Sequence, residues 1–182
     1  KQTPDKPYAS YAEPIIGDVN ADHNNEIVIG AHDLSGAYKI YAFDREGDLL
    51  DGWPVDVPNG MQIHYNPVFA DFRDLEGLGI IVVAHDYHQT SGNNGKLFAL
   101  AADGSPVSGW EGGKSVPLNN FLLGSPTVTN MIDDNPEIFL NTSVGPVGWY
   151  YDGTEIPGWA LSGNHPAPSF PLNIQIVSGL LD

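Results

Sequence analysis

Oxygen-bearing side chains alternate along one short stretch near the start of the chain. Positions 1, 3, 5, 7 and 9 of this stretch are Asp18, Asn20, Asp22, Asn24 and Glu26. Alternate positions of a curling loop point toward one centre, and Ca²⁺ prefers about six to eight oxygen ligands. The stretch has no soft ligand of the kind that favours zinc or copper. It therefore predicts a calcium site, with the backbone carbonyl of Asn24 as the ligand from position 7.

One position of the loop departs from the usual calcium pattern. Position 6 is His23, where glycine is common because the backbone turns sharply there. Histidine is among the residues enriched at positive φ, so the curl remains available. The alternative interpretation is a solvated turn, rich in Asp and Asn, that binds no metal. Glu26 also begins a β-branched segment, so a bound ion would tie two strands together.

Two later loops resemble this one but lack part of its ligand pattern. The loop 71–79 has Arg73 at position 3 and Gly79 at position 9. The Arg73 guanidinium could replace the cation by pairing with Asp71. The loop 130–137 is one residue shorter, and Ile132 takes position 3. We expect neither loop to bind calcium.

The elements that position these loops recur three times in the same order. A proline-containing block lies at 13–18, 66–71 and 125–130; a β-branched block at 26–30, 79–83 and 137–140; an aromatic block at 38–44, 96–100 and 148–152; and Gly-Trp at 52–53, 109–110 and 158–159. Four short segments bounded by turn residues predict a four-stranded antiparallel sheet of about 50 residues, the blade of a β-propeller. A β-sandwich built from unrelated hairpins is the alternative.

The spacing of the blocks predicts an all-β chain that is a single partial β-propeller over 1–182. Its blades are expected at about 10–57, 62–115 and 120–162, and the segment 178–182 resembles the opening of a fourth blade within about 170–182. Three blades cannot close a ring, and an open edge strand at each end is a pairing hazard. We therefore expect another chain or a missing segment to supply the remainder of the propeller.

Composition narrows the classes of partner. The 182 residues include 23 acidic and 7 basic ones, a formal net charge of −16, and no cysteine. This acidity argues against nucleic acid and against anionic membrane surfaces, both of which require clustered Lys and Arg. No apolar run approaches the ~20 residues that span a bilayer, so no membrane insertion is expected. The 21 glycines and 15 prolines favour short strands and tight turns.

Four segments resemble FG-GAP or VCBS-type repeats. They are the loop 18–26, the following Ile-Gly-Ala-His at 29–32, the segment 36–43, and Gly-Trp-Pro at 52–54. These repeats are the calcium-binding propeller blades of integrin α-subunits and of many exported bacterial proteins. The chain departs from the family at His32, where Gly-Ala-Pro is usual. The resemblance covers roughly residues 10–182. It implies a seven- or eight-bladed ring, a structural role for calcium, and a secreted, extracellular or cell-surface location.

Two functions from different classes follow. The first is a non-catalytic, calcium-stabilised scaffold for adhesion or for recognition of a carbohydrate or protein ligand. The second is a part of a secreted propeller enzyme, such as a polysaccharide lyase or a glycosidase, with His85, His88 or Arg73 as candidate residues. The polar stretch 88–96 is expected to be an ordinary solvated loop, with a ligand-contacting loop as its alternative. Most aromatic residues are expected to pack between blades rather than stack on sugars.

Overall fold

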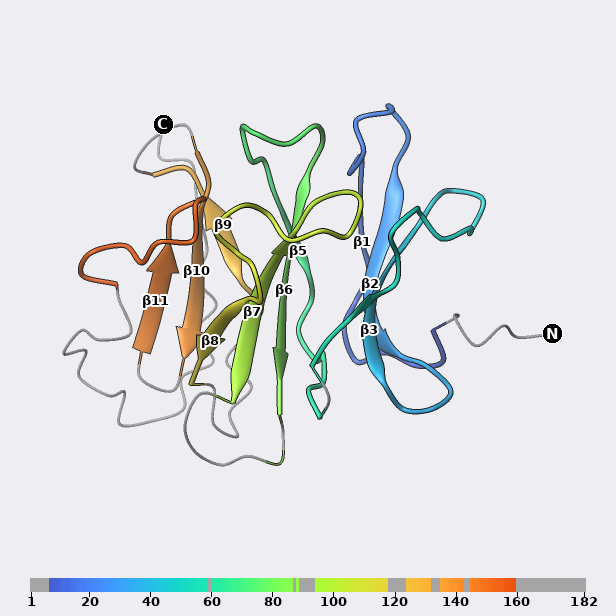
Figure 1. Cartoon of the computed structure of the whole chain (residues 1–182), viewed down its shortest axis with the longest axis horizontal. Helices are drawn as coiled ribbons and strands as arrows, with labels where there is room; N and C mark the ends of the chain where they lie inside the picture. The colour runs from blue at the N-terminus through green and yellow to red at the C-terminus, as the bar shows by residue number, and fades with distance from the viewer. Residues whose placement is uncertain are drawn as a thin grey trace.

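The computed structural model describes residues 7–58, 60–86, 88, 94–117, 124–131, 135–142 and 145–159. Within these residues the chain forms three antiparallel sheets and no helix. The sheets stand side by side in chain order (Figure 1). The expectation of an all-β fold built from small antiparallel sheets is confirmed, whereas a closed ring stays a prediction.

The first two sheets have four strands each, in sequential order. The first contains β1 (Ile15–Gly17), β2 (Glu26–His32), β3 (Tyr38–Phe43) and β4 (Val55–Asp56). The second contains β5 (Val68–Ala70), β6 (Gly79–His85), β7 (Gly95–Leu100) and β8 (Lys114–Val116). Equivalent strands pair in the same register, since Ile15 faces Val28 in the first sheet and Val68 faces Ile81 in the second.

The third sheet has three strands in the described residues. They are β9 (Thr127–Thr129), β10 (Glu137–Thr142) and β11 (Gly145–Trp149), and β10 lies in the middle. The end of the predicted third blade near 160–162 and the predicted opening of a fourth blade at 170–182 lie outside the described residues.

Two hydrophobic clusters hold neighbouring sheets together, and β6 contributes to both. Ile80 and Val82 belong to the cluster shared with the first sheet, whereas Ile81 and Val83 belong to the cluster shared with the third. Because successive side chains of a strand point to opposite faces, this double contact leaves every residue of β6 buried. The unbroken apolar sequence of β6 thus reflects a sheet packed on both faces.

The first sheet differs from the second on its outer face. Along β2, Val28 is fully buried while Ile27 is 36% exposed. Alternation of this kind is typical of a sheet that packs on one face only.

In Figure 1 the predicted ligand loop between β1 and β2 lies at the upper end of this sheet, and the β2–β3 turn lies at the lower end.

Candidate metal centre

The β1–β2 loop curls around the Asp18 carboxylate. Asp18 Oδ1 accepts a hydrogen bond from the Asp22 backbone N–H at 3.1 Å, and Oδ2 accepts one from the His23 N–H at 3.0 Å. Ala21 and His23 both adopt left-handed backbone conformations, with φ of 60° and 68°. His23 therefore adopts the positive φ that glycine usually supplies at position 6. The sequence predicted that histidine could make this turn.

The remaining polar side chains of the loop extend the same curl. Asn20 Oδ1 accepts from the Asp22 N–H at 3.1 Å, and Asp22 Oδ1 accepts from the Asn24 N–H at 2.7 Å. That bond from the Asn24 backbone is the main cause of the lowered pKa of Asp22. Asp22 Oδ1 also accepts from Asn24 Nδ2 at 3.0 Å, so both of its lone pairs are used. Asp22 Oδ2 accepts one bond, from Asn20 Nδ2 at 3.3 Å, and so has capacity for a further cation contact.

Glu26 closes the loop from below and is the most buried of the five predicted ligands. Its side chain belongs to a residue only 1% exposed, and Oε2 accepts a hydrogen bond from the Val19 N–H at 2.9 Å. Burial raises the pKa of Glu26, and the nearby charges of Asp22 and Asp18 raise it further. A buried carboxylate beside two other acids is costly unless a cation compensates for it.

The structure gathers the five predicted residues in one loop, but their oxygens bond mainly to the loop backbone. Asn24 Oδ1 instead accepts from Arg45 Nη1 of the β3–β4 turn at 3.1 Å. Across the described parts of the chain, no three His, Asp or Glu side chains are arranged to hold a metal ion. The predicted donor set of three carboxylates, the Asn20 amide and the Asn24 backbone carbonyl is nevertheless chemically suited to a hard cation such as Ca²⁺.

The counterpart of Glu26 in the third sheet makes the same contact. Glu137 begins β10, is 1% exposed, and accepts a hydrogen bond through Oε2 from the Met131 N–H at 2.7 Å. This carboxylate therefore also closes the end of its loop. Ile132, which takes position 3 of that loop, lies outside the described residues, and the expectation that the loop binds no calcium stays a prediction.

The second sheet replaces the carboxylate with an aromatic ring. Gly79 stands at the position of Glu26, and a Cβ added there would collide with the ring of Phe72. Phe72 is 1% exposed, so its ring fills the space that a side chain at position 79 would need. The sequence identified Gly79 as a missing ligand but carried no signal for the role of Phe72. Asp71 and Arg73 are both exposed, and their pairing remains a hypothesis.

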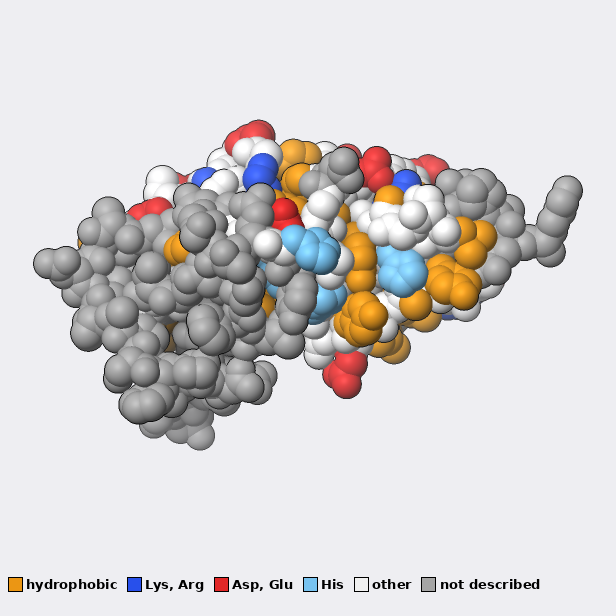
Figure 2. Space-filling view, turned by 90° about the horizontal axis from the view of Figure 1, so that it is seen from below, with side chains coloured by type: hydrophobic (Ala, Val, Ile, Leu, Met, Phe, Trp, Pro, Cys, Tyr) orange, Lys and Arg blue, Asp and Glu red, His pale blue; other side chains and the backbone are white. Residues whose placement is uncertain are grey.

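Histidines and tyrosines gather at the opposite end of the sheets. His64 lies with its ring centroid 4.9 Å from Tyr11, 6.2 Å from Tyr38 and 5.4 Å from His85. His85 is fully buried, and burial, followed by the neighbouring His64, lowers its pKa to about 4. Figure 2, viewed from this end, shows histidine side chains among hydrophobic ones. His85 is therefore a core residue here.

His88 has a different environment from His85. It is exposed, and its backbone N–H donates to Asp86 Oδ1 at 2.9 Å in a local turn. Most of the polar stretch 88–96 lies outside the described residues. Its predicted character as a solvated loop is therefore untested.

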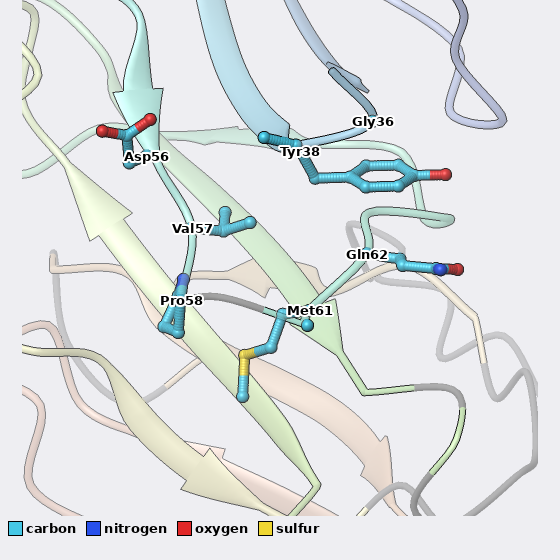
Figure 3. A pocket seen from close by; sticks show the side chains of 9 residues that line it. Gly36, Tyr38, Asp56, Val57, Pro58, Met61 and Gln62 are labelled. Carbon is cyan, nitrogen blue, oxygen red and sulfur yellow. The ribbon is translucent and has the colours of Figure 1, made fainter. Parts of the chain in front are cut away.

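A cavity of about 410 Å³ opens beside this histidine and tyrosine group. Its lining includes the Tyr38 ring, the Asp56 carboxylate, the Met61 thioether and the Gln62 amide (Figure 3). Asp56 also forms an ion pair with Lys39 at 3.0 Å. The lining comes from the β2–β3 turn and the first residue of β3, from β4, and from the segment that follows β4. No sequence motif links these segments, so the cavity could not be predicted from the sequence.

No family model, curated protein or solved structure matches this chain. In the described residues, no helix is long and apolar enough to cross a membrane.

Proposed function

We propose that the chain is a non-catalytic, calcium-stabilised segment of a β-propeller from an exported protein, and that it serves as a scaffold for adhesion or ligand recognition. The observation that carries the proposal is the buried Glu26 carboxylate beneath a curled loop that also holds Asp18 and Asp22. Calcium would supply positive charge to a site where three carboxylates lie in one short loop.

The residues have distinct tasks in this proposal. Asp18 and Asp22 order the loop by accepting backbone hydrogen bonds, so their oxygens are held before an ion binds. Glu26 begins β2, so an ion that it ligates would connect the loop to the sheet. Binding to the folded state alone would then raise stability with calcium concentration. The oxygen-only donor set favours calcium over zinc or copper.

Ligand recognition would use the lower end of the sheets. Tyr8 and Tyr11 are 61% and 72% exposed there, and the cavity lined by Tyr38, Asp56 and Gln62 combines an aromatic ring with hydrogen-bonding groups. Pockets with such a mixture bind small molecules by burying an apolar face while polar groups fix its orientation. A carbohydrate or a protein side chain meets this description.

The rival function, a part of a secreted propeller enzyme, has weaker support. His85 is fully buried, so it does not offer its imidazole to a substrate. His88 and Arg73 are exposed, but they belong to loops at opposite ends of β6. The candidate residues thus do not form one site.

Thermal unfolding with and without calcium tests the proposal. We expect the melting temperature to be higher in millimolar calcium than in EDTA, and we expect Asp18→Asn and Glu26→Gln to abolish that difference. Asp71→Asn is the matched control, because it changes the equivalent aspartate of the loop where Gly79 replaces the buried carboxylate. Equal melting temperatures of the wild-type chain in calcium and in EDTA would refute the calcium role.

A further inference from the structure

The first and second sheets are joined by a contact that we call the Gly-Trp joint. Its donor half is Gly52–Trp53, and its acceptor half is the turn 101–105 of the next sheet. Trp53 Nε1 donates a hydrogen bond to the Ala102 carbonyl at 2.7 Å. Gly52 has a φ of 86°, and a Cβ there would collide with the Asp103 carbonyl oxygen. The joint therefore needs both a glycine and an indole N–H.

The second and third sheets repeat this joint with the same geometry. Trp110 Nε1 donates to the Tyr151 carbonyl at 2.8 Å. Gly109 has a φ of 84°, and a Cβ there would collide with the Asp152 carbonyl oxygen. Trp53 and Trp110 are 7% and 1% exposed. The joint is thus a directional interface, with the donor half on one sheet and the acceptor half on the next.

The third sheet carries a complete donor half. Gly158 has a φ of 85°, and the Trp159 N–H donates to the Ile156 carbonyl at 2.9 Å, as the Trp110 N–H does to Val107 at 2.9 Å. No described atom lies within 4 Å of a Cβ built at Gly158, and Trp159 is 40% exposed. The donor half is preformed here, and no described turn is seated on it.

The first sheet carries the matching acceptor half, the turn 44–48. Its Gly47 N–H donates to the Asp44 carbonyl at 3.1 Å, and the Asp44 N–H donates to the Asp48 carbonyl at 2.9 Å. The turn 101–105 has the same two bonds, at 3.0 and 2.8 Å. Arg45 occupies the position of Ala102, and no described atom lies within 4 Å of a Cβ built at Gly47. The described sheets of one chain therefore carry both halves of a further joint, one on the first sheet and one on the third.

We propose that Gly158–Trp159 of one copy seats the turn 44–48 of a second copy, with the Trp159 indole donating to the Arg45 carbonyl. This interface continues the two joints already present between the sheets. Propellers close with about four to eight blades. Two copies of the three described sheets fall within that range, below the seven or eight blades that the resemblance implies, so we expect a closed dimer with two identical joints rather than an open filament.

Charge sets the conditions under which the dimer forms. Each copy has a formal net charge of −16, and this like charge opposes association at low ionic strength. Salt screens that repulsion: the screening length is about 10 Å at 0.1 M salt, and it becomes shorter as the salt concentration rises. Association should therefore strengthen with sodium chloride, whereas an assembly held together by surface ion pairs would weaken.

Sedimentation velocity of the full chain over a hundredfold range of concentration tests the proposal. We expect the wild-type chain to shift from monomer to dimer with increasing concentration in high salt. Trp159→Ala and Gly47→Ala should each remain monomeric, and Trp159→Phe should associate more weakly than wild type because it keeps the ring but loses the N–H. Leu34→Ala is the control, because it changes an exposed apolar side chain in another turn, and it should associate like wild type.

A mixture of two defective variants gives the sharpest readout. Gly47→Ala copies retain an intact Gly158–Trp159, and Trp159→Ala copies retain an intact turn 44–48, so an equimolar mixture restores one of the two joints. We expect the mixture to form heterodimers that neither variant forms alone, with circular dichroism confirming that both variants are folded. A wild-type chain that stays monomeric throughout, a Trp159→Ala variant that dimerises like wild type, or a mixture without heterodimers would overturn the proposal.

Discussion

Acidification should destabilise the protein through His85 before most carboxylates titrate. The side chain is fully buried, and its pKa is lowered to about 4 from an ordinary 6.5. As the pH falls below 6.5, the unfolded chain binds a proton at this residue while the folded chain does not. Stability attributable to His85 is therefore complete above pH 6.5 and decreases as the pH falls toward 4.

The size of the effect follows from the two pKa values. The full difference corresponds to about 3 kcal/mol, and about 2 kcal/mol of it is lost by pH 5. The groups around His85 set this balance. His64 adds to the lowering of the pKa, whereas the charge of Asp86 opposes it. Backbone bonds of 2.8 and 2.9 Å tie His85 to Gln62, so protonation should loosen the segment that connects the first two sheets.

Urea unfolding at pH 7 and pH 5, followed by tryptophan fluorescence, measures the effect. We expect His85→Gln to be less stable than wild type at pH 7 but to lose about 2 kcal/mol less between the two pH values. His88→Gln is the matched control, because His88 is exposed, and its loss should equal that of wild type. Equal losses for His85→Gln and wild type would show that the buried imidazole does not control acid stability.

Two further predictions concern the contacts between and within the sheets. Phe72→Ala should destabilise the chain by about 3–5 kcal/mol in urea unfolding, because it empties a buried site beside Gly79; a cost below about 1 kcal/mol would mean that the ring does not fill this space. Trp110→Phe should cost about 1–3 kcal/mol by the same assay, since it leaves the Tyr151 carbonyl without its indole donor. Trp53→Phe should behave alike if the two joints are equivalent, and an effect confined to one of them would contradict that equivalence.

Local sequence patterns were sufficient to predict the class of fold. Short β-branched runs bounded by glycine and proline specify strands and turns through the backbone preferences of a few residues. The same is true of the curl at 18–26, because Asx side chains bond to backbone N–H groups only a few positions away. These interactions are local, so the order of strands and the position of the candidate ligands could be predicted without coordinates.

The environment of a side chain was determined by the neighbouring sheet. His85 appeared in the sequence as a candidate for chemistry, but β6 packs on both faces and buries it. In the second sheet, where Gly79 stands in place of a carboxylate residue, the Phe72 ring fills the site only because Gly79 leaves room for it. The cavity beside Tyr38 likewise combines segments that no motif connects. Burial and its effect on pKa depend on atoms distant in the sequence, and only the tertiary structure brings those atoms together.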